Sequence, residues 1–465
     1  MIVASDASRL LAAVAVCLGL TAACTSTPEP GLDEEAGAST TVPTTAAPAP
    51  TGPGGGEDAP GPGTPSLTGD ELVERLAELG GRLAVGNGPE LSVARPDGAA
   101  EILLDGSETV VAAQPTWSHD GTVLAWTSLS AAGQVVVAQG FGEDGLPAGD
   151  PAEAEAAGNP VFYLQWNHAD DRLAYLRTSA VGTEVEVGLV EPGAPIVPLA
   201  TGAPYFIAWS PTPDRLLAHV DDAAIDAFDA GDPDGGFRTV ADLGGGFSAP
   251  AWVDEGRALV VADGALSLLD VSSGTVEAVE PIGGPMAFVL SPDRRRVAYQ
   301  RLDGSDGLLL ARATPAAGDG LTVLDLETGE RALVTGDLAS AWEWSPDGTR
   351  LAWLSTDVGL RPVGRWHFWS VDGSMTATDR TPEFILTRKY GGVYLPFFAQ
   401  YAQSVTGWAP DSTAFAFAGG LDGDRGVWVQ LLDEAVRPHR VALGDFVTWG
   451  PGEPLPAAGG GVSAA

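Results

Sequence analysis

From residue 81 onward, short runs of alternating apolar and polar residues are separated by turn residues. In one clear example, Leu351-Ala352-Trp353 follows the turn Ser345-Pro346-Asp347-Gly348. Alternation with a period of two predicts half-buried β-strands, and clusters of Gly, Pro, Asp and Ser predict the turns between them. The pattern therefore predicts an all-β body over residues 81–451.

The segment just before this body has a different period. Leucines recur on one helical face across residues 67–80, and Thr68 with Glu71 makes a capping-box pattern. Gly80 and Gly81 follow and are expected to end the helix. We predict one short helix over residues 67–80.

A repeated motif organises the β-rich body. Each copy has an aromatic or large apolar anchor, a four-residue turn and a short apolar strand, as in WSPDGTRLAW. The copies begin at Trp117, Trp166, Trp209, Trp252, Leu290, Trp344 and Trp408, and a degenerate copy contains Trp449. Repeats of about forty residues with several strands each indicate the blades of a β-propeller.

The residue types of the motif have a physical explanation. The anchor ends one strand and fills the space between adjacent sheets. In the turn that follows, Pro fixes φ, the Asp side chain accepts hydrogen bonds from nearby backbone N–H groups, and Gly permits a positive φ. We expect the motif turns to reverse the chain from the innermost strand of each blade to the next.

These copies resemble the WD40-like repeat of TolB-type β-propellers, whose hallmark is W-S-P-D-G followed by a short apolar strand. The resemblance covers about residues 82–450. It implies a single propeller that makes protein contacts at the cell envelope without catalysis. A separate N-terminal α/β domain of the TolB type is not recognisable, so the resemblance does not imply the translocation role.

The two ends of the repeat region predict how the ring closes. Residues 82–105 supply three strands without an aromatic anchor strand, and the segment around Trp449 supplies an anchor strand alone. Joined, they make one composite blade that leaves no open sheet edge. Seven complete repeats and this blade predict eight blades. Seven blades are the alternative, should the repeat near Trp252 or the stretch from Leu290 be misread.

The N-terminal residues have the features of an export signal. Arg9 precedes an apolar run, and small residues lead to Cys24 in LTAAC, which resembles the lipobox of bacterial lipoproteins. Residues 1–23 are therefore predicted to be a signal peptide and Cys24 the lipidated residue. This anchor would place the protein on the outer face of the cell membrane. We expect residues 24–66, rich in Pro, Gly and Thr, to be a disordered tether, and residues 452–465 a disordered tail.

Charge and cysteine content narrow the function further. The formal net charge is −38, with 62 acidic against 24 basic residues, and Lys389 is the single lysine. Binding to a phosphate backbone needs a basic face, so nucleic acid is excluded as a partner. The only cysteines are Cys17 and Cys24. The body therefore has no disulfide and relies on its core.

Local motifs for catalysis or metal binding are weak. His119 and His168 take equivalent positions in neighbouring repeats, either as a metal pair or as turn residues at the rim. The Asp-rich segment 229–237 lacks the ligand spacing of a calcium loop. No G-x-S-x-G occurs, and no spacing singles out a pair of carboxylates. We predict no catalytic residue, cofactor or metal, although carboxylates clustered with Arg or His at the channel mouth would favour an enzyme.

An aromatic insertion at residues 387–404 accounts for the longest spacing between anchors. Aromatic and Arg side chains are typical of binding hot spots. The same aromatics are equally suited to filling the space between blades or capping the channel. As candidate binding residues we select Arg388, Tyr390, Tyr394, Phe397, Phe398 and Tyr401.

Three functions compete on this basis. The first is a non-catalytic scaffold or protein-interaction module at the cell envelope, anchored by lipid. The alternative is a ligand-binding or sensory lipoprotein accessory to a membrane transporter, with the aromatic insertion as contact surface. The third is a propeller enzyme of the lyase or glycosidase type. No residue pattern predicts the oligomeric state.

Overall fold

The computed structural model describes residue 67 and residues 69–454, except residues 181–183, 203–204, 213–214, 222–223, 244–247, 285, 302–319, 358–361, 376–380 and 435. The predicted signal peptide, Cys24, the tether and Thr68 lie outside the described residues.

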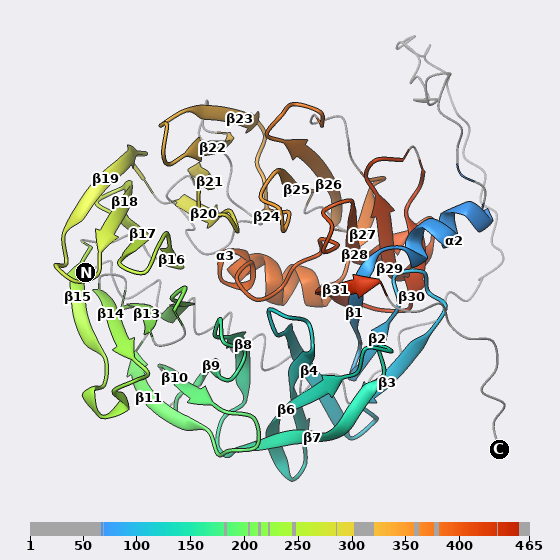
Figure 1. Cartoon of the computed structure of the whole chain (residues 1–465), viewed down its shortest axis with the longest axis horizontal. Coiled ribbons are helices and arrows are strands. Elements are labelled where there is room, and N and C mark those ends of the chain that lie inside the picture. The colour runs from blue at the N-terminus through green and yellow to red at the C-terminus, as the bar shows by residue number, and fades with distance from the viewer. Residues whose placement is uncertain are drawn as a thin grey trace, which may run out of the picture.

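Strands of the described residues form seven hydrogen-bonded sheets, arranged as a ring around a short central helix (Figure 1). Six sheets have four strands and one has seven, and all pairings are antiparallel. In five of the six four-stranded sheets the innermost strand ends on a motif anchor, and in the sixth the innermost strand contains Trp449. The chain is therefore an all-β propeller, as predicted. No helix among the described residues is long and apolar enough to cross a membrane.

The first half of the ring is made of four sheets. The composite sheet contains β1 (Gly80–Asn87), β2 (Glu90–Ala94), β3 (Glu101–Asp105) and β31 (Phe446–Pro454). The next two sheets contain β4 (Val110–Trp117), β5 (Val123–Ser130), β6 (Gly133–Phe141) and β7 (Pro147–Ala156), then β8 (Val161–Trp166), β9 (Leu173–Thr178), β10 (Val185–Val190) and β11 (Val197–Gly202). The fourth contains β12 (Tyr205–Trp209), β13 (Arg215–Val220), β14 (Ala224–Asp229) and β15 (Arg238–Asp242), with the short 3₁₀ helix η1 (Pro233–Gly235) before β15.

Three sheets complete the ring. They begin with β16 (Ala251–Trp252), β17 (Arg257–Ala262), β18 (Ala265–Asp270) and β19 (Val276–Pro281), then β20 (Met286–Leu290), β21 (Arg296–Arg301), β22 (Leu321–Asp325) and β23 (Arg331–Thr335). The seven-stranded sheet contains β24 (Ala341–Trp344), β25 (Arg350–Asp357), β26 (Val363–Ser370), β27 (Phe384–Leu386), β28 (Ala414–Leu421), β29 (Asp424–Leu431) and β30 (His439–Ala442).

This largest sheet explains why repeats and sheets differ in number. It holds the repeats of both Trp344 and Trp408, because the short strand β27 pairs with β26 on one side and β28 on the other. Trp408 itself makes only an isolated bridge to Phe415. Eight anchors thus map onto seven sheets. Counted by sheets, the ring has the seven blades that were predicted as the alternative. The prediction of eight blades treated the repeats of Trp344 and Trp408 as separate blades.

The composite sheet closes the ring as predicted. β31 pairs with β1 in a register that places Val85 opposite Val447 and Leu83 opposite Trp449. The helix α2 (Gly69–Ala77) lies against this sheet, and its buried Leu76 belongs to the same apolar cluster as Trp449. Boundaries at both ends differ from the prediction. The helix predicted over residues 67–80 spans only Gly69–Ala77, and the first strand already begins at Gly80. β31 runs to Pro454, so residues 452–454 are strand rather than tail.

The motif turns have the predicted chemistry. Ser345 Oγ donates to Asp347 at 2.6 Å and accepts the Arg350 N–H at 2.9 Å, while Asp347 accepts the Thr349 N–H at 3.0 Å. Gly348 has a φ of +68°, the left-handed conformation that a side chain disfavours. Most polar groups of the turn are thus satisfied by residues within five positions along the chain.

Five tryptophan anchors join their repeats to the preceding one. Five indoles donate a hydrogen bond of 3.1–3.2 Å to the backbone carbonyl one residue before the previous anchor. These donors are Trp166, Trp209, Trp252, Trp344 and Trp408. At these five positions tryptophan contributes its N–H as well as its volume.

Candidate functional site

The aromatic insertion fills the centre of the ring. Its π-helix η3 (Tyr390–Tyr394), 3₁₀ helix η4 (Leu395–Phe397) and helix α3 (Phe398–Tyr401) follow one another, and Figure 1 shows α3 encircled by the sheets. We call residues 390–401 the plug. Phe398 is 1% exposed and packs edge-to-face on Trp342 of β24, with ring centroids 4.5 Å apart. The plug thus belongs to the core of the molecule.

Hydrogen bonds attach the plug to the innermost strands. The Gln400 side chain accepts the Ile207 N–H at 2.8 Å and donates to the Ile207 carbonyl at 2.9 Å. It also donates to the Tyr163 hydroxyl at 2.8 Å, and the Tyr401 hydroxyl donates to Gln114 Oε1 at 2.9 Å. An innermost strand has one unpaired edge facing the channel, and Gln400 supplies that edge of β12 with the pairing a neighbouring strand would give.

A buried carboxylate holds the other side of the plug. Glu343 of β24 is 5% exposed and accepts hydrogen bonds from the Tyr394 hydroxyl at 2.9 Å and the Gly407 N–H at 2.9 Å. Burial raises the pKa of Glu343, and the hydrogen bonds oppose that shift. Burial, followed by the charge of Glu343, raises the pKa of Tyr394 well above its ordinary value. These residues connect the plug with the blade of Trp344.

A pocket of about 100 Å³ lies beside the plug, near the start of the innermost strands. Its walls are mostly apolar, with Phe162 of β8 and Phe446 of β31 opposite the plug residues Tyr394 and Tyr401. Polar groups at its edge include Gln114, whose φ of +57° is rare outside glycine. The β-bulge of β4 at this point turns the Gln114 side chain toward Tyr401.

The predicted binding residues are distributed unequally around this pocket. Tyr394 and Tyr401 line it, whereas Phe398 packs on Trp342. Tyr390 and Phe397 are half-buried, and Arg388 is exposed. The burial of these side chains thus shows that the insertion caps the channel, which is one of the two roles predicted for it. Contact of the insertion with a ligand stays a prediction. Sequence reasoning missed Phe162 and Gln114, because nothing local distinguishes them from other strand residues.

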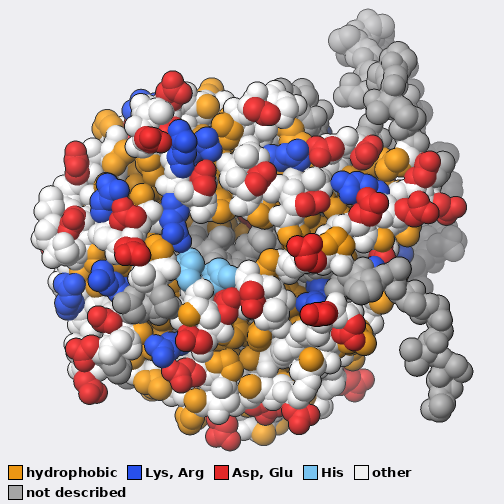
Figure 2. All heavy atoms as spheres, in the orientation of Figure 1, with side chains coloured by type: hydrophobic (Ala, Val, Ile, Leu, Met, Phe, Trp, Pro, Cys, Tyr) orange, Lys and Arg blue, Asp and Glu red, His pale blue; other side chains and the backbone are white. Residues whose placement is uncertain are grey.

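The opposite end of the channel carries a different group of side chains. His119 and His168, in the turns after β4 and β8, stack with ring centroids 4.7 Å apart. Asp170 Oδ1 lies 2.7 Å from His119 Nδ1, and Arg294 from the turn after β20 donates to His168 Nε2 at 3.2 Å. We call these four residues the mouth cluster. Figure 2 shows histidine side chains beside the hollow at the centre of this face.

The mouth cluster keeps His168 neutral. Burial, then the charges of His119 and Arg294, lower the pKa of His168 to about 4. The contact with Arg294 requires an unprotonated Nε2, because the guanidinium only donates. A cation beside this nitrogen also opposes metal binding there. Among the described residues, no group of three His, Cys, Asp or Glu side chains is arranged to hold a metal.

The two histidines are recognisable in the sequence, whereas Asp170 and Arg294 were not predicted. Both occupy the position that is glycine in Ser345-Pro346-Asp347-Gly348, with φ values of +56° and +58°. A bulky residue where a repeat requires a left-handed backbone was therefore the available signal.

Comparisons with known proteins add distant likenesses in fold. No family model matches the chain, and no curated protein does. The structure is similar to a eukaryotic initiation factor, with 12% identity over 80% of this chain and 98% of that one and a TM-score of 0.45. It is also similar to TolB from Acinetobacter baumannii, with 11% identity over 80% of this chain and 67% of that one and a TM-score of 0.34. A putative 6-phosphogluconolactonase from Bacteroides fragilis matches with 16% identity over 64% of this chain and 94% of that one, and with a TM-score of 0.39. We draw no functional argument from likenesses this distant.

Proposed function

We propose that the protein is a non-catalytic, TolB-like binding module, held on the outer face of the cell membrane by lipid on Cys24, that engages a protein partner of the envelope. The observation that supports this function is the plug. Because residues 390–401 occupy the channel with buried aromatic side chains, no substrate passes through the ring, and recognition falls to its two ends. The LTAAC motif and the repeat supply the envelope location and the TolB likeness.

The pocket end is the surface that we assign to the partner. A volume of about 100 Å³ with apolar walls suits one aromatic or branched side chain, the usual form of an interface anchor. Lys389 lies at the pocket edge, 3.5 Å from Asp445, and Arg388 beside it is exposed. An apolar pocket with a lysine in its wall fits a partner segment with an apolar anchor and a neighbouring acidic residue.

Phe162 and Phe206 form a matched pair for testing this assignment. Both are half-buried on neighbouring innermost strands. Phe162 lines the pocket together with Tyr394 and Tyr401 of the plug. Phe206 instead packs edge-to-face on Phe397 of the plug and does not line the pocket. We expect Phe162→Ala to weaken partner binding about tenfold, since truncating a central anchor contact costs that much in affinity. Phe206→Ala should bind as the wild type does. Tyr394 and Phe398 are unsuitable because both are buried and their truncation would test packing.

The measurement is crosslinking of the lipid-anchored protein in its native envelope, followed by quantitative mass spectrometry. A partner recovered with the wild type and Phe206→Ala, and depleted with Phe162→Ala, supports the proposal. Cys24→Ala protein is the control for anchoring and should leave the membrane fraction. No reproducible partner from folded, anchored protein would contradict a binding module. A small molecule recovered in place of a protein would support the ligand-binding lipoprotein instead.

The geometry of the mouth cluster favours an enzymatic role as the second candidate function. Asp170 orients His119 through Nδ1, as a carboxylate does for an imidazole that acts as a general base. A screen for hydrolase and lyase activity, with His119→Gln as the inactive control, tests this candidate. Activity that survives this substitution would not come from the cluster.

A further inference from the structure

Arg294 is an unusual residue for its place in the repeat. It takes the glycine position of the motif turn and adopts a φ of +58°, which is disfavoured for a large side chain. The equivalent residue of the next repeat is Gly348, with a φ of +68°. A strained residue that persists where glycine would relieve the strain points to a role for its side chain.

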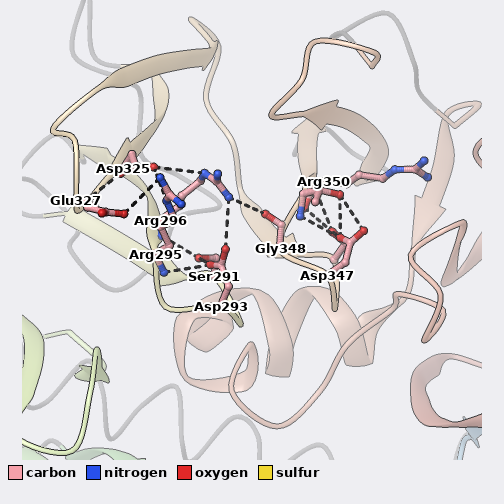
Figure 3. Close-up of polar contacts among 11 residues, drawn as sticks. Ser291, Asp293, Arg295, Arg296, Asp325, Glu327, Asp347, Gly348 and Arg350 are labelled. Atoms are coloured by element: carbon pink, nitrogen blue, oxygen red, sulfur yellow. Dashed lines mark hydrogen bonds and ion pairs between the residues drawn. The ribbon is translucent and has the colours of Figure 1, made fainter.

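Arg294 differs from the two arginines that follow it, because each of those two is paired with a carboxylate. Figure 3 shows Arg295 and Arg296 turned toward carboxylates, and Arg295 binds Asp325 at 3.0 Å while Arg296 lies 3.4 Å from Asp293. Arg294 has no carboxylate within salt-bridge distance among the described residues, in a chain with 62 acidic side chains. Burial of its guanidinium lowers the pKa of Arg294 from its ordinary value, with no opposing carboxylate charge.

The side chain instead reaches across the mouth of the channel. Arg294 follows β20 and His168 follows β8, with two sheets between them, yet the guanidinium and imidazole are 3.2 Å apart. One N–H of the fork is used in this contact, and a guanidinium has five. The remaining donors are used by no other side chain or backbone group among the described residues.

The nearby carboxylates are already occupied by donors. Asp170 accepts the backbone N–H groups of His119 at 2.8 Å and Asp120 at 3.1 Å, besides the His119 ring. Asp293 accepts the Ser291 hydroxyl at 2.5 Å and the Arg295 N–H at 3.1 Å. Their charges are therefore engaged within the turns. Because Asp170 accepts the Nδ1 proton of His119, whose side chain is 43% exposed, Nε2 of that ring is left as a hydrogen-bond acceptor for a ligand.

We propose that the mouth cluster is an anion-binding site, in which Arg294 holds the carboxylate or phosphate group of a small molecule and His119 Nε2 accepts a hydrogen bond from a hydroxyl of the same molecule. Arg294 supplies a charged donor fork, which matches the oxygen spacing of both groups. Neutral His168 orients the guanidinium, and Asp170 orients His119. This inference does not depend on the partner assigned to the pocket end, which lies on the other side of the plug.

Isothermal titration calorimetry of the folded protein with inorganic phosphate and, separately, with citrate tests the site. Arg294→Gly is the decisive variant, because glycine is the residue that the turn prefers and the variant should fold. We expect it to weaken binding at least about tenfold, the usual effect of losing a charged donor. Arg295→Gln, which changes the adjacent arginine, should alter affinity less than about twofold.

The two ligands distinguish the sources of the anionic group. Binding of phosphate alone assigns a phosphate group, and binding of citrate alone assigns a carboxylate. Binding by neither anion to the wild type would overturn the proposal. So would equal affinity of Arg294→Gly and the wild type. An equal loss in Arg295→Gln would likewise overturn it, because the effect would then report general charge.

Discussion

Single polar side chains connect neighbouring blades through the backbone. Gln134 of β6 both donates to the Val161 carbonyl and accepts its N–H, at 3.2 and 2.6 Å. Gln300 of β21 accepts the Ala339 N–H at 3.1 Å, and His219 of β13 lies 2.9 Å from the Ser248 carbonyl through Nδ1. Each satisfies the chain just before or at the start of the next innermost strand. The same task is thus done by an amide in some blades and by an imidazole in another.

The histidine at this position, where other blades have glutamine, makes one blade sensitive to acid. Burial lowers the pKa of His219 to about 4 from its ordinary 6.5, since the side chain is fully buried. A histidine with a lowered folded-state pKa contributes stability above pH 6.5 that is lost as the pH falls toward 4. We expect His219 to account for roughly 2 kcal/mol of the stability lost between pH 7 and pH 4.5.

The variant His219→Gln isolates this effect. Gln300 stands ten residues after Leu290, as His219 stands ten after Trp209, so glutamine already serves at the equivalent position. Urea unfolding at the two pH values should show a smaller loss of stability in His219→Gln than in the wild type. An identical loss in both proteins would show that His219 does not titrate on unfolding.

The plug is the element that most depends on its surroundings. Four-residue α3 has too few intrahelical hydrogen bonds to be stable alone, and η3 begins without a side-chain cap. Contacts with β4, β8, β12 and β24 hold it, through Gln114, Tyr163, Ile207 and Glu343 respectively. Its order therefore follows from closure of the ring around it.

Gln400→Ala should lower the free energy of unfolding by about 2–4 kcal/mol. The change removes three hydrogen bonds, which leaves the buried Ile207 N–H without its Gln400 partner and the Ile207 carbonyl with only the 3.4 Å contact from Gln403. Gln403→Ala is the matched control, because its contacts with Ile207 and Pro250 are 3.4 and 3.5 Å long, and it should cost less than about 1 kcal/mol. Equal effects in urea unfolding would show that Gln400 does not hold the plug.

Closure of the ring is a property of the whole molecule. β31 enters the first sheet about 360 residues after β1, and its Trp449 indole donates to the Gly80 carbonyl at 2.9 Å. The sheets share one ring, so each is stabilised by neighbours on both sides. Loss of β31 exposes an edge of the composite sheet and of the following blade.

Deletion of the chain after Asp445 should therefore destabilise the entire body. We expect the melting temperature to fall by about 10 °C or more, with a less cooperative transition in calorimetry. A truncation after Pro454, which keeps β31, is the control and should melt like the full chain. Identical melting of the two truncated proteins would refute a closing role for β31.

The sequence by itself determined the architecture. The copies of W-S-P-D-G specify a turn whose hydrogen bonds join residues within five positions of one another, as Ser345, Asp347 and Arg350 do. Such local chemistry needs no distant partner, so the repeat, its strands and the unpaired first and last segments were sufficient to predict a propeller and its composite sheet. The insertion was recognisable as exceptional for the same reason, since it interrupts the repeat.

Only the tertiary structure decided what meets at the centre of the ring. Arg294 and His168 are 126 residues apart, and Gln400 and Ile207 are 193 apart. The joining of two repeats by β27 was equally invisible, because three residues carry no periodicity. Contacts across the channel depend on how many sheets surround it and how they are rotated. These quantities are set by the packing of whole blades, and no local pattern of residues encodes them.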